Sequence, residues 1–250
     1  MWMPLPDRDF DTTEVAVPWR LLRDAGHTVT FATESGATPA CDPRLLSGVL
    51  FGKLGAADEP KRFYAELEEA PEFRATVPWG TIDVGAFDGL ILPGGHAPGM
   101  RQYLGSAELH DKVAAFWRRG LPVGAICHGV LVLARARDVA TGKSVIAAAR
   151  TTCLPKYLER NGYLLTFWKL GRYYRTYDAY VEDEVRGALD DPDEQFVRGP
   201  RVATRRGTAT DDRPAFVVED GRYVSARWPG DAYLFTRKFL ERLASASIAA

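Results

Sequence analysis

Two neighbouring residues with reactive side chains lie at one junction of the sequence. In the stretch AICHGVLVLARA (125–136), a run of small and apolar residues typical of a buried strand ends at Cys127, and an apolar, helix-like run follows. The pattern small–x–nucleophile–x–small, formed here by Ala125, Cys127 and Gly129, is typical of a nucleophile elbow, because larger side chains would collide across so tight a turn. The pattern predicts Cys127 as a nucleophile with His128 directly beside it. The alternative is a buried structural cysteine.

An elbow would change the chemistry of the sulfur in three ways. It would hold Cys127 clear of the backbone, where a substrate can reach it. It would place the sulfur beside a helix N-terminus, whose dipole favours the thiolate. Backbone N–H groups nearby could also stabilise an oxyanion that forms during the reaction.

A glycine pair follows another strand-like run, in LILPGGHAPG (90–99). Gly94 and Gly95 allow a sharp turn and a close approach of backbone to ligand. In an open parallel sheet, ligands bind beyond the carboxyl ends of the strands, so Gly95 and Cys127 could face one pocket, and His96 could line it. His96, His128 and Glu14 could also form a metal site, but their spacing gives no support, and we predict no metal.

A third candidate residue, Glu14, lies near the start of a helix-like run (11–27). Asp11 or Thr12 can cap this helix, which should end near Gly26. Pro18 cannot bond the carbonyl of Glu14, so we expect an irregular helix that turns the Glu14 side chain into a cleft. The alternative is a solvated glutamate that interacts only with the helix dipole.

The rest of the chain predicts the elements that position these residues. Strand-like and helix-like runs alternate, which favours a parallel sheet with helices on both faces. The run 215–226 predicts a hairpin that turns at residues 219–222. The expected strands are 27–33, 87–93, 121–127 and 143–149, and the expected helices are 12–25, 60–69, 106–119, 128–137, 155–170 and 231–243.

Two long segments, 34–86 and 154–200, exceed what a minimal layered domain needs, and we interpret them as insertions in a single domain that spans residues 1–250. The tyrosine- and arginine-rich tract 171–180 should form a lid or a subunit interface. We expect the tract 198–213 to be a charged loop. The first strand-like run, WMPLP, is short and holds two prolines, so we expect either a truncated strand or a start that lies upstream.

Composition limits the classes of function. With 32 basic and 33 acidic residues, the net charge of −1 does not favour nucleic acid or a membrane surface as a partner. No apolar run approaches the ~20 residues of a membrane span. Three cysteines and no signal peptide predict a cytoplasmic protein without a disulfide framework, in which Cys41 and Cys153 are ordinary thiols.

Four blocks of the sequence, in this order, resemble the ThiJ/PfpI superfamily within the class I glutamine amidotransferase-like fold. They are TEVAVPWRLLRDAGHTVTFAT, FDGLILPGGHAPG, GLPVGAICHGVLVLA and GRYVSARWPGDAYLFTRKFLERL. The resemblance implies an α/β flavodoxin-like three-layer sandwich with a mostly parallel central sheet, a homodimer, and a reactive Cys127 that needs no cofactor. It also implies that Glu14 is the acid beside the thiol and that the N–H groups of Gly95 and His128 form an oxyanion hole. The WPG segment (228–230) would lie near the mouth of the site.

The sequence departs from this family at positions that matter for His128. Where the PfpI branch has a glutamate from a neighbouring subunit, this chain has Gly99. Where chaperone-like members have an acid after the next strand, no acid occurs before Glu159. No histidine follows His128, so the downstream His-x-Glu pair of true glutamine amidotransferases is absent, and we do not expect glutamine hydrolysis.

Three hypotheses follow. The first is an enzyme of the glyoxalase III or deglycase type, which attacks small reactive carbonyls through a Cys127 hemithioacetal. The second is a cysteine peptidase or amidase that uses Cys127 and His128. The third is a redox sensor or holding chaperone in which Cys127 is oxidised.

Overall fold

A seven-stranded sheet forms the centre of the protein. The structure, a computed structural model, describes residues 1–201 and 204–249. The strand order is β5-β3-β1-β6-β7-β9-β8, and the neighbours are parallel except for β8 and β9. A short parallel pair, β2 (Arg8–Phe10) and β4 (Ala40–Cys41), forms a second sheet. The seven strands are β1 (Trp2–Pro4), β3 (Thr30–Thr33), β5 (Val77–Pro78), β6 (Leu90–Leu92), β7 (Val123–Ile126), β8 (Val217–Asp220) and β9 (Tyr223–Ala226).

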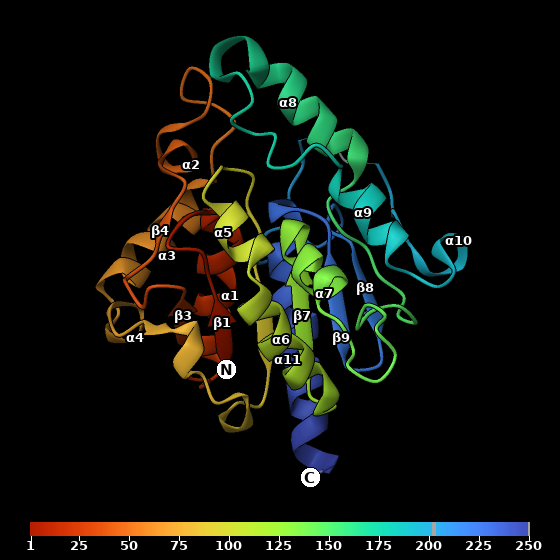
Figure 1. Cartoon of the computed structure of the whole chain (residues 1–250). Coiled ribbons are helices and arrows are strands. Elements are labelled where there is room, and N and C mark those ends of the chain that lie inside the picture. Colours follow the sequence, from red (N-terminus) through yellow and green to blue (C-terminus); the bar gives the residue numbers. More distant parts are fainter. Residues whose placement is uncertain (202–203, 250) are drawn as a thin grey trace.

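Helices cover both faces of the sheet (Figure 1). On one face, α1 (Thr12–Asp24) contacts α3 (Asp58–Glu69) and α11 (Ala232–Ala249). On the other, α7 (Val130–Arg135) contacts α5 (Met100–Gly105), α6 (Ala107–Arg118) and α9 (Val181–Gly187). The chain therefore has the predicted flavodoxin-like α/β architecture, and one large apolar cluster fills the space between sheet and helices.

A further helix, α8 (Lys156–Leu170), lies across the end of the sheet at which the parallel strands finish (Figure 1). This is the end at which α/β proteins of this type bind ligands. The shorter elements are α2 (Pro43–Ser47), α4 (Pro71–Arg74) and α10 (Pro192–Gln195), with 3-10 turns η1 (Trp79–Thr81), η2 (Val84–Ala86), η3 (Cys127–Gly129) and η4 (Pro229–Asp231).

Most of the predicted elements are confirmed, including the hairpin of β8 and β9, and the first strand-like run forms β1 between β3 and β6. The strand expected at 143–149 is wrong. This segment is a series of turns, with a single bridge from Ser144 to Arg137. Ile146 and Ala147 are nevertheless buried. Apolar runs indicate burial, but they do not separate a buried turn from a buried strand.

The two long segments differ in their relation to the core. Residues 34–86 contribute the edge strand β5 and the helix α3, so this segment is partly built into the layered fold. Residues 154–200 supply α8, α9 and α10. That the whole chain is a single domain stays a prediction.

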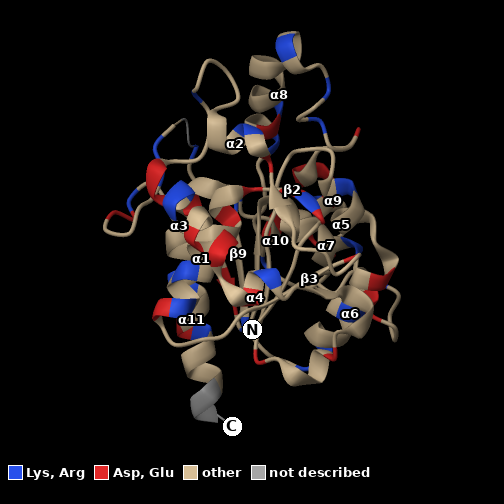
Figure 2. Cartoon of the chain, turned by 90° about the vertical axis from the view of Figure 1, so that its left-hand side faces the viewer, with Lys and Arg blue, Asp and Glu red and all other residues tan. Residues whose placement is uncertain are grey.

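Charged residues of both signs alternate over α1, α3 and α11 (Figure 2). In the part of the chain that the structure describes, no helix is both long enough and apolar enough to cross a membrane.

Candidate functional site

Cys127 lies on a strained turn at the end of β7. Its backbone φ of 58° is in the left-handed region, which non-glycine residues adopt at a cost of about 1–3 kcal/mol. Two residues on, a Cβ at Gly129 would lie 2.0 Å from the Leu92 carbonyl oxygen, so this close approach to the end of β6 requires glycine. These features agree with a nucleophile elbow. Cys127 itself is fully buried.

Helix α1 brings Glu14 to this elbow. Asp11 caps the helix by accepting hydrogen bonds from the N–H groups of Thr13 (2.8 Å) and Glu14 (3.1 Å). Glu14 Oε2 in turn accepts a hydrogen bond of 2.7 Å from the Gly94 N–H, and the carboxyl lies beside the Cys127 thiol. The helix is continuous through Pro18, contrary to the expected irregularity. The Glu14 side chain therefore points inward because Asp11 caps the helix and Glu14 lies in its first turn. A break in the helix is not needed.

The close packing of Glu14 depends on the absence of a side chain at Gly94. A Cβ there would lie 2.7 Å from the His128 nitrogen and 2.8 Å from Glu14 Oε2. Glu14 Oε1 is buried and makes no regular hydrogen bond to any described residue. This oxygen is therefore free to hold a proton that points at the thiol or at a ligand.

Burial raises the pKa of the acidic groups of the site. Loss of solvation raises the pKa of Cys127 well above its usual range, and the adjacent Glu14 carboxylate raises it further. Burial likewise raises the pKa of Glu14 well above 4.5, with a second contribution from Asp11. The pKa of Asp11 rises to about 6, because its burial outweighs the nearby charge of Arg206. Burial therefore favours the protonated forms of the Cys127 thiol and of the Glu14 carboxyl, which face each other.

The two histidines of the site form a pair. His128 Nδ1 lies 3.5 Å from Cys127 Sγ, and the rings of His96 and His128 meet edge to face with centroids 4.6 Å apart. Burial lowers the pKa of His96 to about 4 and that of His128 well below its usual value. Both imidazoles are therefore neutral, and no imidazolium stabilises a thiolate at Cys127 in the resting state.

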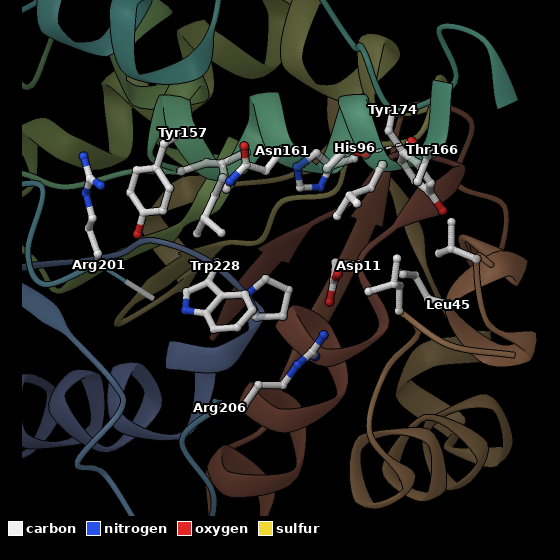
Figure 3. Close-up of a pocket in the computed structure, with 17 residues that line it drawn as sticks. Asp11, Leu45, His96, Tyr157, Asn161, Thr166, Tyr174, Arg201, Arg206 and Trp228 are labelled. Carbon is white, nitrogen blue, oxygen red and sulfur yellow. Dashed lines mark hydrogen bonds between the residues drawn. The ribbon is translucent and has the colours of Figure 1, made fainter. Parts of the chain in front are cut away.

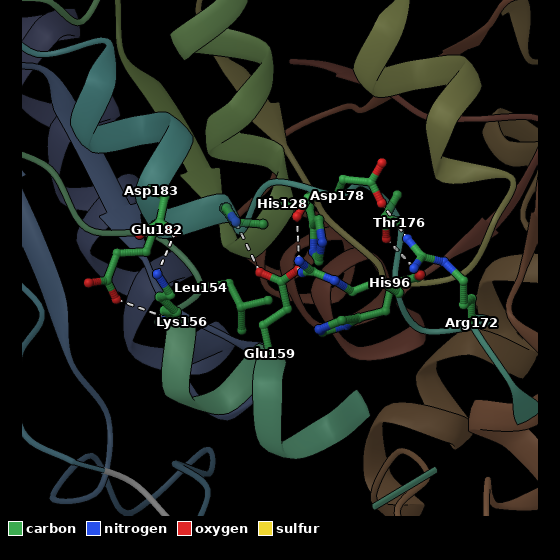
Figure 4. A network of polar contacts seen from close by, with 12 residues as sticks. His96, His128, Leu154, Lys156, Glu159, Arg172, Thr176, Asp178, Glu182 and Asp183 are labelled. Carbon is green, nitrogen blue, oxygen red and sulfur yellow. Dashed lines mark hydrogen bonds and ion pairs between the residues drawn. The ribbon is translucent and has the colours of Figure 1, made fainter. Parts of the chain in front are cut away.

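His128 has no acidic partner among the described residues, since its buried Nε2 atom makes no hydrogen bond there. Figure 4 shows Glu159 in the same region as His128 and His96. Its carboxylate, however, accepts hydrogen bonds from the Arg175 guanidinium and the Val181 N–H, each at 3.0 Å. Glu159 therefore anchors α8 instead of orienting His128.

One group of side chains could hold a soft metal ion. Donor atoms of His96, Cys127 and His128 lie within 4.8 Å of one another. The sequence had suggested Glu14 with the two histidines, but the third member of this group is Cys127. A thiolate and two neutral imidazoles are ligands that suit Zn²⁺. Binding would require Cys127 to lose its proton.

A cavity of about 630 Å³ opens next to the elbow, beneath α8 (Figure 3). His96 and Asp11 line the end near Cys127, and Trp228 and Pro229 of the WPG segment form another wall, as the resemblance implied. Cys127 and His128 do not line it. The half-buried His96 therefore separates the cavity from the sulfur.

The tract 171–180, which lies over this cavity, makes hydrogen bonds to residues of the site. The Tyr174 hydroxyl donates to Asp42 (2.8 Å), and the Thr176 hydroxyl donates to the His96 carbonyl (2.8 Å). The tract 171–180 thus packs on the site as part of its lid. Sequence reasoning missed the cavity residues of α8 as well as Arg201 and Arg206. The sequence predicted Asp11 only as a helix cap. Its position three residues before Glu14 was the signal that the two carboxyl groups lie close together.

The other two cysteines are core residues. Both Cys41 and Cys153 are buried, and burial raises the pKa of Cys41 to about 11. Burial also raises the pKa of Cys153 well above its usual range.

Fold and site together define a flavodoxin-like α/β protein with a buried cysteine at an elbow between strand and helix. The sequence model described as ThiJ/PfpI family-like matches residues 5–200, and the chain belongs to this family.

Several relatives and solved structures are similar to the whole chain. An uncharacterized protein of Schizosaccharomyces pombe is 29% identical, over 98% of this chain and 84% of its own length. A deglycase of Pyrococcus abyssi is 25% identical, over 94% and 93%. The crystal structure of glyoxalase III from Candida albicans superimposes with a TM-score of 0.69 at 18% identity, covering 96% of this chain and 95% of the other. At that identity the superposition shows the shared fold.

Proposed function

We propose that this protein is a cysteine-dependent enzyme that converts small reactive carbonyls, such as methylglyoxal, into hydroxy acids. The observation that supports this function best is the buried contact between the Glu14 carboxyl and the Cys127 thiol, with Glu14 Oε1 unpaired. The names of the Pyrococcus abyssi deglycase and of the Candida albicans glyoxalase III agree with the same class of reaction.

The first step adds the thiol to the aldehyde. A bond forms between Cys127 Sγ and the aldehyde carbon, the C=O double bond becomes a C–OH single bond, and the thiol proton reaches that oxygen through Glu14 or His128. Because the thiol, the aldehyde and the product hemithioacetal are all neutral, the step moves a proton without adding net charge to a buried site. The N–H groups of Gly95 and His128 are the proposed donors to the oxygen.

The remaining steps need water but no oxidant. Transfer of a proton from the former aldehyde carbon to the neighbouring carbonyl carbon, together with transfer of the hydroxyl proton to the oxygen of that carbonyl, turns the hemithioacetal into a thioester of a 2-hydroxy acid. Water then cleaves the thioester and restores the thiol. For methylglyoxal, the sum is one aldehyde and one water giving one lactate. Glu14 and His128, the groups beside the sulfur, are the proposed proton carriers.

The test is lactate formation from methylglyoxal by three variants. We expect Cys127→Ala and Glu14→Gln to abolish it, and Cys153→Ala, which changes a buried cysteine away from the elbow, to retain it. Unchanged turnover in both Cys127→Ala and Glu14→Gln would overturn the proposal.

The two other hypotheses have less support. A peptidase or amidase needs an orienting acid for its histidine, and His128 has none among the described residues. A peroxide sensor needs an accessible thiolate, and the raised pKa of the buried Cys127 opposes one. Mass spectrometry after mild peroxide treatment checks this directly, because preferential oxidation of Cys127 over Cys41 and Cys153 would favour the sensor. A homodimer and a cytoplasmic location stay predictions.

A further inference from the structure

The cavity beside the elbow is much larger than a three-carbon aldehyde. Its volume of about 630 Å³ falls within the range of roughly 300–1,000 Å³ that accommodates drug-sized ligands. Its walls are mostly apolar, with Leu154, Leu158 and Leu165 on one side and Trp228 on another. A substrate that fills it has an apolar body beyond the reacting carbonyl.

Two arginines, Arg201 and Arg206, line this cavity, and the charge of Arg206 acts on the nearby Asp11. The Arg206 guanidinium lies 5.3 Å from the Trp228 ring and donates a long hydrogen bond of 3.3 Å to the Gly55 carbonyl. The Arg201 guanidinium lies over the Tyr157 ring, at 5.9 Å. Neither forms an ion pair with a carboxylate in the described part of the chain. Stacking on an aromatic ring holds a guanidinium in place while its donors stay available.

A second cavity, of about 470 Å³, shares Tyr157, Asn161 and Arg201 with the first. It adds three cationic side chains. Lys156 pairs with Asp183 (2.6 Å) and Arg198 pairs with Glu182, whereas Arg160 has no ion pair among the described residues. Among the described residues, Arg201, which lines both cavities, and Arg160, which lines the second, are therefore cations without an ion pair.

The charges along the two cavities are unevenly distributed. Asp11 is the one carboxylate among the described residues that line them, and it lies in the same cavity as His96. Arg160, Arg198 and Lys156 line only the other cavity. An extended ligand in both cavities would thus meet His96 and Asp11 in the first and a surplus of positive charge in the second.

We propose that the substrate is an aldehyde or 2-oxoaldehyde with an apolar body and an oxyanion group, a carboxylate or a phosphate, which Arg160 and Arg201 bind. This inference rests on the proposed function for its reacting end, which lies against His96, the residue between the cavity and Cys127. Guanidinium groups bind carboxylates and phosphates through pairs of parallel hydrogen bonds. The apolar wall between the two ends sets the length of the substrate.

Turnover of matched substrates tests the proposal. Phenylglyoxal and 4-carboxyphenylglyoxal share one reactive group and differ by one carboxylate. We expect kcat/KM to be about tenfold higher for the carboxylated compound, as for a partly exposed charge-assisted contact. In Arg201→Gln and Arg160→Gln this ratio should fall toward one. In Arg150→Gln, which removes an exposed arginine away from both cavities, it should stay. Equal kcat/KM for the two substrates in the unaltered protein would overturn the proposal.

Binding tests the anion site without turnover. In a Cys127→Ser variant, 4-acetylbenzoate should bind about tenfold more tightly than acetophenone by calorimetry, and Arg201→Gln should remove the difference. Benzoate and phenyl phosphate, compared as inhibitors of phenylglyoxal turnover, distinguish carboxylate from phosphate. Arginine-dependent binding in a protein that turns over no aldehyde would overturn the proposed function and leave the anion site standing. Turnover of phenylglyoxal without arginine-dependent binding would overturn the anion site alone.

Discussion

The buried Glu14 carboxyl should make the protein less stable as the pH rises, and Glu14→Gln should remove this loss. An unfolded glutamate releases its proton near its ordinary pKa of 4.5, whereas burial raises the pKa of Glu14 in the folded protein well above that value. Between the two pKa values the folded state holds one more proton than the unfolded state. Its free energy of unfolding therefore falls by about 1.4 kcal/mol per pH unit in that window. The loss begins near pH 4.5 and continues up to the raised pKa of the folded protein.

The amide of Glu14→Gln isolates this effect because it keeps the size of the side chain. Its carbonyl oxygen can still accept the hydrogen bond that the Gly94 N–H donates at 2.7 Å. Asp11, whose pKa also rises, to about 6, contributes a slope of the same sign to both proteins, so the difference between the proteins reports Glu14. Below pH 4.5 the carboxyl is protonated in both states and the benefit of the amide disappears.

Urea unfolding at pH 5, 6, 7 and 8 measures the difference. Relative to the unaltered protein, Glu14→Gln should gain stability as the pH rises above 5, by up to about 1.4 kcal/mol per pH unit. Glu108→Gln, a change at an exposed glutamate, should show no such trend. Parallel stability curves for Glu14→Gln and the unaltered protein would refute the assignment of a raised pKa to Glu14.

Three further predictions concern packing and reactivity. Gly94→Ala should lower the free energy of unfolding, measured in urea, by about 1–3 kcal/mol, because the added Cβ collides with the elbow. Gly162→Ala should not lower it, because no atom lies within 4 Å of the added Cβ. Equal stability of the two variants would contradict the packing argument. Arg227→Met should cost about 3 kcal/mol by thermal unfolding, because it leaves the fully buried Asp231 without its ion-pair partner; a change below 1 kcal/mol would count against this. Cys127 should react slowly with iodoacetamide at pH 7 and faster at higher pH, as followed by peptide mass spectrometry, because its pKa is raised; rapid labelling at pH 6 would contradict a neutral thiol.

The sequence predicted the strands that are continuous apolar runs and the turn that carries a glycine signal. Continuous apolar runs identified β6 and β7, and the turn signal near Gly221 identified the hairpin of β8 and β9. It did not reveal β4 and β5, because two-residue strands are too short for a periodic pattern. At 143–149 it failed for another reason, since the buried alanines there pack as turns.

The candidate site was predictable only where its residues are set by local geometry. The small residues around Cys127 indicate the elbow by themselves, while Glu14 needed the family resemblance. The cavity could not be predicted, because its walls come from segments that meet only in the folded chain. The contact of Thr176 with the His96 carbonyl joins residues 80 positions apart, and Arg206 is farther still from His96 in sequence. No periodicity or motif encodes such contacts.

Because α8 lies across the carboxyl ends of the strands, the reactive residues and the residues that line the cavity belong to different parts of the chain. The elbow and Glu14 belong to the layered core, where Gly94 and Gly129 admit no side chain. Much of the wall that a substrate would touch belongs to a separate helix and its flanking loops. Under the proposed function, exchanges in α8 would therefore change the substrate that is bound and leave the elbow and Glu14 unaltered. This part of the chain is the natural target for a directed-evolution library, and the elbow is the part that such a library should leave unchanged.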